Sequence, residues 1–461
     1  MQDQGKWFVG MQINPVSLAD EGVDVVLDAA QEKAAATAAV VTVHTFNPEL
    51  MERPAEYSGH GVRGPHGNSG GTFVTTHDEY YRGLPVSGFR ASGSLFDGLD
   101  VLDAVGPGAR SRGLDLYGYM LETTSTGGTQ THVPGFSRLL EIDPWGRVGQ
   151  LPCVNNPDYR LWKRSLLTDF YATHDFDGFA WGVERWGPLH RALMGESVGC
   201  FCPYCKEVAA ADGIDLDRTA TAYRAVLETM WGQVDSSTER DGFALRMIDG
   251  LLQYPEVLAW ERSWTRAYLG LHREMYGLAK WLAPDRPFGL GLWHYYFIDP
   301  LLRTEWNAWD WTRSADFLRP ILYHLAEGHR IQDFATKLSQ GPLTGATPEE
   351  ACSWLMRMVG LDLDVKFPAM GDGLPADYVR TGVEIVRNSL AGDLPVYAAI
   401  GVDIREKGCP ATTPEDVEAA VEAAVDGGAA GITASRNYAE MTMPNLEAVG
   451  TAVRRLRGAG A

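Results

Sequence analysis

Short apolar runs alternate with amphipathic stretches along the whole chain. Eight runs made largely of apolar residues predict buried strands at residues 7–13, 38–43, 113–122, 179–183, 287–293, 315–322, 395–400 and 429–434. Stretches in which apolar residues return every three or four positions predict helices at residues 23–36, 99–105, 159–173, 218–231, 255–282, 347–359, 376–390, 414–426 and 446–456. Because strands that are apolar throughout are covered on both faces, the pattern favours a parallel sheet surrounded by helices.

Eight strands that alternate with helices predict an α/β protein with a (β/α)8 TIM barrel. A doubly wound open sheet is the alternative, but no glycine-rich phosphate loop follows the first strand. We expect a single barrel domain over residues 1–461, with long loops at 48–97, 123–156 and 185–255. In such barrels the functional residues come from the C-terminal ends of the strands.

Carboxylates stand at the ends of three predicted strands. Glu122 ends the third strand, Glu184 ends the fourth, and Asp403 follows the seventh. Their position at the expected functional face makes Glu184, Asp403 and Glu122 the candidate catalytic residues. Two of them also have a structural interpretation, since Glu184 can pair with Arg185 and Asp403 with Arg405.

Other residues at the strand ends suit a sugar pocket. Imidazole and guanidinium groups bond sugar hydroxyls, and indole rings stack on the apolar faces of sugars. The candidate substrate-binding residues are His44, Trp181, Trp186, Trp293, His294, Tyr323 and Arg436. Each of these residues alone is as consistent with a packing role as with substrate binding, but their placement at the same end of the barrel favours a pocket. A shift of one residue along the strand would point the side chain of His44 away from the barrel interior and into the surrounding layer. The fixed positive charge of Arg436 suits an anionic sugar.

A cysteine cluster follows the fourth strand. Cys200-x-Cys202-x-x-Cys205 places three thiols within six residues, and Cys153 offers a fourth from a preceding loop. Four thiolates form a closed tetrahedral site for zinc, and such a site is structural because it leaves no open position. The alternative is a group of reduced cysteines without metal. Cys352 and Cys409 lie far away in the sequence and are interpreted as ordinary residues.

The segment from Cys153-Val154-Asn155-Asn156-Pro157-Asp158-Tyr159 through Glu184 to Cys205 resembles the clan A β-galactosidases of glycoside hydrolase family 42. The resemblance covers roughly residues 150 to 210, and the rest of the chain only as a barrel. It implies that Glu184 is the general acid/base and that the four cysteines hold a structural zinc. Two positions depart from the family, in which an asparagine precedes the acid/base and the nucleophile is a glutamate. This chain has Val183 and Asp403 there.

Composition narrows the function classes further. The formal net charge of −20 argues against nucleic-acid and anionic-membrane partners, which require a basic face. No run approaches the roughly 18 to 20 apolar residues of a membrane span. The first residues, MQDQGK, lack the features of a signal peptide, and clustered cysteines favour a reducing compartment, so we expect a cytoplasmic protein. We expect no organic cofactor, and homo-oligomerisation remains open.

Three functions fit these observations, and hydrolysis of a sugar or small glycoside ranks first. Two carboxylates about 5 to 5.5 Å apart would retain the anomeric configuration, and about 6.5 to 9.5 Å apart would invert it. Asp299 and Glu305, after the fifth strand, are rivals for the second carboxylate. A metal-dependent sugar isomerase, epimerase or lyase ranks second, with N/O ligands drawn from His44, His77, Glu122, Glu184 and His294. A non-catalytic carbohydrate-binding barrel ranks third.

Overall fold

The computed structural model describes residues 7–46, 70–91, 96, 98–121, 133–232, 243–306, 311–363 and 365–459. Glu122, one of the three candidate catalytic carboxylates, lies outside these residues. So does most of the predicted loop at 48–97.

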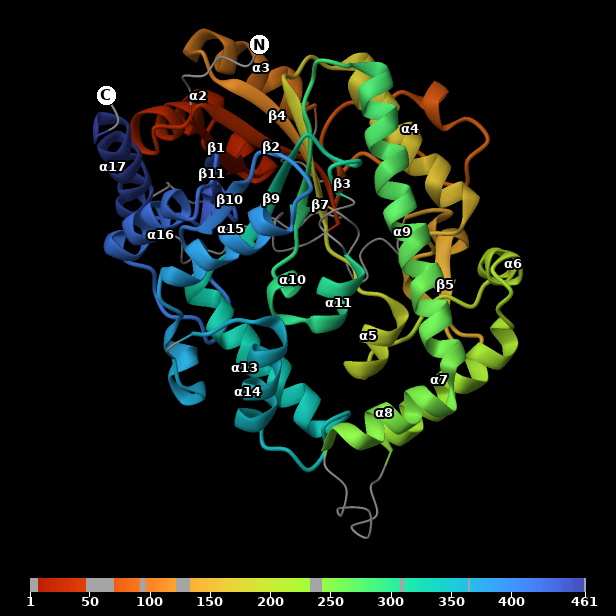
Figure 1. Ribbon diagram of the computed structural model, residues 1–461. Helices are drawn as coiled ribbons and strands as arrows, with labels where there is room; N and C mark the ends of the chain where they lie inside the picture. Colours follow the sequence, from red (N-terminus) through yellow and green to blue (C-terminus); the bar gives the residue numbers. More distant parts are fainter. Residues whose placement is uncertain are drawn as a thin grey trace.

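Eight parallel strands close into a barrel, which confirms the predicted fold class (Figure 1). The strands are β1 (Phe8–Ile13), β2 (Ala38–Thr45), β4 (Asp115–Leu121), β7 (Gly178–Val183), β8 (Phe288–Leu292), β9 (Phe317–Leu322), β10 (Tyr397–Gly401) and β11 (Gly431–Ser435). Each pairs in parallel with its chain neighbours, and β1 pairs with both β2 and β11, which leaves no open edge. All eight strands lie where the apolar runs predict them.

Helices follow the strands and form the outer layer. They are α1 (Pro15–Asp20), α2 (Val23–Asp28), α3 (Val101–Arg112), α4 (Pro157–Thr173), α5 (Pro188–Leu193), α6 (Pro203–Ala211), α7 (Leu216–Trp231), α8 (Phe243–Gln253), α9 (Pro255–Leu282), α10 (Tyr295–Ile298), α11 (Pro300–Glu305), α13 (His324–Gln340), α14 (Pro348–Val359), α15 (Asp377–Ser389), α16 (Pro414–Asp426) and α17 (Met443–Ala459). The short strands β3 (Gly71–Thr72), β5 (Leu140–Ile142) and β6 (Val148–Pro152) lie in the loops. Among the described helices, none is long and apolar enough to cross a membrane.

Local sequence determines where the main helices begin. Thr413 caps α16 and Thr347 caps α14, each in a capping box that satisfies backbone N–H groups reciprocally. Asn156 accepts a hydrogen bond from the Asp158 N–H at the start of α4, and proline occupies the first helical position. These caps explain why helices predicted from periodicity begin within a few residues of the expected positions.

Aromatic rings fill the N-terminal end of the barrel interior. Phe8 and Tyr397 stack at 4.2 Å between centroids, and Phe317 lies 5.0 Å from Tyr397 and 6.0 Å from Tyr117. A packed floor of this kind leaves only the opposite, C-terminal face for a site.

The longest insertions all follow strands at that C-terminal face. The connection from β7 to β8 carries α5 to α9, β8 is followed by α10 and α11, and β9 by α13 and α14. In Figure 1, α5, α7, α8, α13 and α14 lie at the opposite end of the molecule from the two chain termini.

Candidate active site at the barrel mouth

Glu184 lies at the C-terminal end of β7, in phase with the residues that face the barrel axis. Side chains alternate along a strand. Ala180 belongs to the interior cluster, and a Cβ on Gly182 would meet the hydroxyl of Tyr119 inside the barrel. Trp181, by contrast, packs on α9. Glu184 continues the inward phase and is half-buried.

A layer of buried polar side chains lies inside the barrel below Glu184. Nη2 of Arg319 on β9 donates to Oγ of Ser435 on β11 at 2.5 Å and to the side chain of Gln12 on β1. The guanidinium also lies 5.3 Å from the ring centre of Tyr119. Burial raises the pKa of Tyr119; Arg319 opposes that rise, and Glu184 adds to it. Arg319 and Glu184 therefore act on the same hydroxyl group.

Asp403 follows β10, but its carboxylate is bound to the start of α17. Oδ2 accepts hydrogen bonds from the N–H and the hydroxyl of Thr442, at 2.7 and 3.1 Å, and Oδ1 accepts one from Nδ2 of Asn445 at 3.0 Å. Burial raises its pKa, although these hydrogen bonds oppose the rise. The observed role of Asp403 is to tie the loop after β10 to α17, and its predicted catalytic role has no further geometric support.

Glu406 is a second carboxylate in the same loop. It forms a two-point pair with Arg330 of α13, and Nη1 of Arg436 lies 3.4 Å from Oε1. Burial opposes ionisation, but Arg330 and Arg436 outweigh it and lower the pKa of Glu406 to about 2. Glu406 and Asp403 both line a cavity of about 460 Å³ at the end of β10.

Arg436 is engaged by carboxylates of its own surroundings. Its Nη2 donates to Oε1 of Glu440 at 2.6 Å, and Nε contacts both oxygens of that carboxylate. With Glu406 on its other side, the charge of Arg436 is compensated within the protein. The predicted affinity of Arg436 for an anionic sugar therefore finds no support in its contacts.

Trp186 and Trp293 lie together, as a sugar-stacking surface requires. Their ring centroids are 4.5 Å apart, and Tyr295 lies 4.7 Å from each. The two indoles are half-buried rather than sealed in the core. His190 stacks on Trp186 with 4.4 Å between the ring centroids and completes the aromatic group.

His294 and Tyr323 are brought to the same end of the barrel. Nδ1 of His294 lies 3.1 Å from Oε1 of Glu327, and burial lowers the pKa of this imidazole although Glu327 opposes the change. Tyr323 is buried beside Arg319, Arg330 and Arg436, all of which lower its pKa against the rise caused by burial.

Two predicted substrate-binding residues lie in the outer layer instead. Trp181 is fully buried and meets His272 of α9 at 5.1 Å, because its strand position points away from the axis. The register between β2 and β4 shifts between Thr42 and His44. His44 is fully buried against Trp162 of α4, and its Nδ1 lies 3.0 Å from Oγ1 of Thr72. The expectation that these two side chains contact substrate is therefore corrected.

The four clustered cysteines converge into one buried group. Their Sγ atoms all lie within 4.8 Å of one another, and Sγ of Cys153 lies 3.5 Å from that of Cys202 and 3.4 Å from that of Cys205. A tetrahedron with Zn–S bonds of about 2.3 Å has edges of about 3.8 Å, so the arrangement fits zinc. Burial raises the pKa of Cys200, whereas the neighbouring thiols lower that of Cys202.

The ligands named for a mouth metal do not gather among the described residues. His44 lies in the wall and His294 pairs with Glu327, while Nδ1 of His77 lies 2.8 Å from Oδ1 of Asp169 on α4. The described side chains bring together one other potential ligand group, Asp100, Asp103 and His174. In that group Asp100 caps α3 and bonds His174, which is a structural role.

Asp299 and Glu305, the rival carboxylates, belong to a buried acidic group away from the axis. Asp299 caps α11 and forms an ion pair with His190. Burial raises the pKa of Glu305 to about 10, and neighbouring Glu261 adds to the rise. Their partners thus come from the outer helices rather than from the polar layer inside the barrel.

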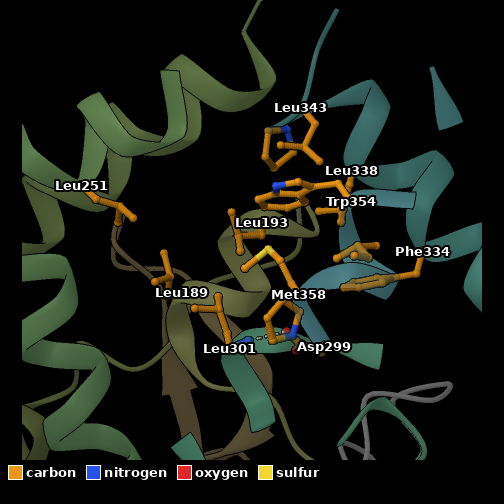
Figure 2. Close-up of a pocket in the computed structure, with 13 residues that line it drawn as sticks. Leu189, Leu193, Leu251, Asp299, Leu301, Phe334, Leu338, Leu343, Trp354 and Met358 are labelled. Carbon is orange, nitrogen blue, oxygen red and sulfur yellow. Dashed lines mark hydrogen bonds between the residues drawn. The ribbon is translucent and has the colours of Figure 1, made fainter. Parts of the chain in front are cut away.

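An apolar pocket lies beside this acidic group, between α5, α8, α11, α13 and α14 (Figure 2). Leu189, Leu193, Leu338, Leu343 and Met358 are among its lining residues. The one charged residue of the lining is Asp299, which Figure 2 shows at one end, hydrogen-bonded to the N–H of Leu301. The insertions after three successive strands therefore pack on one another through an apolar seam.

Sequence reasoning missed Arg319, Arg330 and Glu406. Arg319 carried a signal, because it is a charged residue in the middle of the apolar run FLRPIL. Glu406 stands three residues beyond Asp403, past the end of the strand, and Arg330 lies within a helix. The spacing of Glu406 and Arg330 in the sequence did not indicate a functional pair, since only the folded loop brings them together.

No protein-family model and no curated protein matches the chain. Among solved structures, a β-galactosidase from the psychrophilic Marinomonas ef1 matches with a TM-score of 0.54 and 12% identity, over 98% of this chain and 60% of that one. An α-L-fucosidase isoenzyme 2 from Paenibacillus thiaminolyticus matches with a TM-score of 0.51 and 10% identity, over 99% and 50%.

The PgaB (BpsB) glycoside hydrolase domain from Bordetella bronchiseptica matches with a TM-score of 0.51 and 12% identity, over 98% of both chains. This chain thus spans half to three fifths of the fucosidase and the galactosidase, and nearly all of the PgaB domain. At these identities the comparisons show a shared fold, and they confirm a barrel like those of glycoside hydrolases.

Proposed function

We propose that this protein hydrolyses a glycosidic bond and that Glu184 protonates the leaving oxygen. The observation that carries the proposal is the inward-facing position of Glu184 at the C-terminal end of β7, above a buried polar layer inside a closed barrel. Carboxylates at this face of a barrel are placed for chemistry. The solved structures that share the fold include enzymes named for galactosides and fucosides, which supports a carbohydrate substrate.

Glu406 is our candidate for the second carboxylate. Hydrolysis requires one protonated acid and one ionised partner, which either attacks the anomeric carbon or activates water. Arg330 and Arg436 keep Glu406 ionised at neutral pH. Asp403, in the same cavity, has both oxygens occupied by Thr442 and Asn445, and so ranks below Glu406.

The half-buried rings of Trp186 and Trp293 offer a surface on which a sugar can stack. Indole faces bind the apolar C–H faces of pyranose rings and exclude water from the bond that is cleaved. His294 and Tyr323 lie at the same end and can orient hydroxyl groups. These residues bind and position, and Glu184 transfers the proton.

We also propose that Cys153, Cys200, Cys202 and Cys205 hold a structural zinc ion. Four buried Sγ atoms within 4.8 Å of one another support it. A bound zinc would anchor the loop before α4 to the start of α6. It would take no part in hydrolysis, because four thiolates leave no open coordination position.

Hydrolysis of a panel of nitrophenyl glycosides and oligosaccharides tests the proposal. We expect wild-type activity that survives EDTA, and a loss of about 100-fold or more in kcat in Glu184→Gln. Glu228→Gln is the matched control, because Glu228 is exposed on α7; it should retain wild-type activity.

Three outcomes would contradict the proposal. Activity that is lost in EDTA and restored by Mn²⁺ would favour the metal-dependent isomerase, epimerase or lyase. Unchanged activity in Glu184→Gln would remove the assigned proton donor. Sugar binding without turnover by the folded protein would favour the carbohydrate-binding barrel.

A further inference from the structure

Arg319 is a charged residue built into the interior of the barrel. It occupies the middle of β9, all six residues of which are buried, and its own exposure is 3%. The residues before and after it in the inward phase are Phe317 and Ile321, which belong to apolar clusters. A guanidinium at such a position loses most of its hydration, a cost that the fold must offset.

Within the described residues, no carboxylate forms an ion pair with Arg319. Its Nη2 donates to the neutral side chains of Gln12 and Ser435, and the hydroxyl of Tyr119 is a further neutral hydrogen-bond partner of the guanidinium. Nε is buried and has no hydrogen-bond partner among the residues that the structure describes. The other two arginines of this region differ, since Arg330 and Arg436 are each paired with glutamates.

The uncompensated charge lies next to the proposed proton donor. Glu184 and Arg319 both act on the hydroxyl of Tyr119. Arg319, Arg330 and Arg436 all act on Tyr323. Of these three arginines, Arg319 is the one that no carboxylate of the described residues pairs with, whereas Arg330 and Arg436 are paired with glutamates.

We infer that Arg319 forms an anion-binding subsite at the floor of the mouth that holds a carboxylate of the substrate, which makes the substrate an acidic glycoside such as a uronide. The inference rests on the proposed function for its reaction and adds the class of sugar. A carboxylate accepts charge-assisted hydrogen bonds from guanidinium groups, which suit its planar geometry. Nε of Arg319, which has no hydrogen-bond partner among the described residues, is a donor left for such a bond.

Matched pairs of substrates test this subsite. The nitrophenyl glucuronide and glucoside, and the galacturonide and galactoside, differ chiefly in one carboxylate. We expect wild-type kcat/KM to be at least about 10-fold higher for the acidic member of the preferred pair. Arg319→Gln should lower this acidic-to-neutral ratio by about 10- to 100-fold, and Arg319→Lys by less, because lysine keeps the charge. Arg455→Gln, at an exposed residue of α17, should leave the ratio unchanged.

A ratio near one in the wild type, or a ratio that Arg319→Gln does not change, would overturn the subsite while leaving hydrolysis intact. If no glycoside is cleaved, the proposed function fails and calorimetry decides the subsite separately. Wild-type protein that binds glucuronate or galacturonate but not the neutral sugar, more weakly at high salt, supports it. Equal binding, or no binding, overturns it. The wild-type comparison stands even if Arg319→Gln does not fold.

Discussion

Asp403 and Glu406 are three residues apart, yet the structure gives their carboxylates different surroundings. Asp403 accepts three hydrogen bonds from neutral donors of Thr442 and Asn445. Glu406 lies between two guanidinium groups and stays ionised. A carboxylate bound by neutral donors at a helix start stabilises that helix, whereas one held ionised beside arginines is suited to stabilise positive charge on a reacting sugar.

We expect exchange of these two residues for their amides to separate the two roles. Glu406→Gln should lower kcat by about 100-fold or more, because it removes the ionised partner of Glu184. Asp403→Asn should lower the free energy of unfolding by about 1 to 3 kcal/mol through weakened bonds to α17, with kcat within about 10-fold of wild type. Steady-state kinetics and urea titrations measure both effects. The reverse pattern would return the second carboxylate to Asp403.

At the scale of single residues, the sequence predicted which residues lie at strand ends, but not always which of their side chains face the barrel axis. Glu184 keeps the inward phase because β7 is regular. His44 loses the phase expected of it because one irregularity in the pairing of β2 and β4 reverses its side. Periodicity carries no information about such a shift, since every residue of β2 is buried, on both faces of the sheet.

At the scale of elements, the cysteine cluster joins segments that are remote in sequence. Cys153 precedes α4, Cys200 and Cys202 lie before α6, and Cys205 lies within it. The amide N–H of Ile142 points to Sγ of Cys200 at 3.4 Å, and Nδ2 of Asn155 points to Sγ of Cys205 at the same distance. N–H donors of this kind stabilise thiolates, which are the form that binds metal.

We expect the purified protein to contain about one zinc ion per chain and Cys205→Ser to lose it. The variant should also unfold at a temperature lower by more than about 5 °C, because metal binding contributes to folding. Elemental analysis and calorimetry measure the two changes. Cys409→Ser is the control, since Cys409 lies outside the cluster and should keep the metal. Zinc retained in full by Cys205→Ser would contradict the assignment.

A buried pair of carboxylates links α9 with α11. Oε2 of Glu261 accepts hydrogen bonds from the N–H of Leu189 at 2.6 Å and from the hydroxyl of Tyr223 at 3.3 Å. The hydroxyl of Thr265 donates to Glu305 at 3.2 Å. Burial raises the pKa of Glu261 from 4.5 to about 7. Two adjacent carboxylates with raised pKa values share a proton rather than ionise together.

This pair should make the free energy of unfolding fall as the pH rises above 4.5. Both folded-state pKa values exceed the ordinary value of 4.5, so the folded state binds more protons and the free energy of unfolding falls as pH rises from 4.5 through about 7 and on toward 10. Glu305→Gln removes one titrating group. The free energy of unfolding of the variant minus that of wild type should therefore be on the order of 2 kcal/mol larger at pH 9 than at pH 5. Urea titrations of both proteins at pH 5 and pH 9 measure this difference. The same difference between variant and wild type at the two pH values would contradict the prediction.

The sequence predicted the main elements well and the insertions poorly. The strands and most of the long helices were found because their apolar periodicity is strong and their starts carry proline or capping residues, but the 17-residue helix α13 and the helices α6 and α8 were missed. The short helices α5, α10 and α11, of four to six residues, were missed. They exist because the insertions pack on one another, a tertiary effect that no local window contains.

At the scale of the whole molecule, alternation of strand and helix was sufficient to predict the barrel. Closure follows from the pairing of β1 with both β2 and β11, and the parallel order follows from the helical connections. The pairing of these side chains inside the barrel was not predictable, because Gln12, Arg319 and Ser435 come from strands that are more than a hundred residues apart. Their contact depends on the closed barrel as a whole.

Trp231, the last residue of α7, joins two helices of the insertion after β7 and also contacts the segment that follows α13. Its Nε1 donates to the carbonyl of Ala192 at 2.9 Å, next to the end of α5. Its ring lies against Gly341, directly after α13, where an added Cβ would come within 2.6 Å of Cζ2. Gly341 is thus required for a close approach between the insertion and the helix that follows β9.

We therefore expect Gly341→Ala to displace Trp231 and loosen the insertion while the barrel stays folded. The free energy of unfolding should fall by about 1 to 3 kcal/mol, as for other overpacked sites. Hydrogen exchange should accelerate in α5 and α7 and remain slow in the strands. Gly277→Ala is the matched control, because a Cβ at this exposed position of α9 meets nothing within 4 Å. It should stabilise the protein by about 0.5 to 1 kcal/mol. Uniform acceleration across barrel and insertion in Gly341→Ala would show that the two unfold as one unit, without a separate attachment at Trp231.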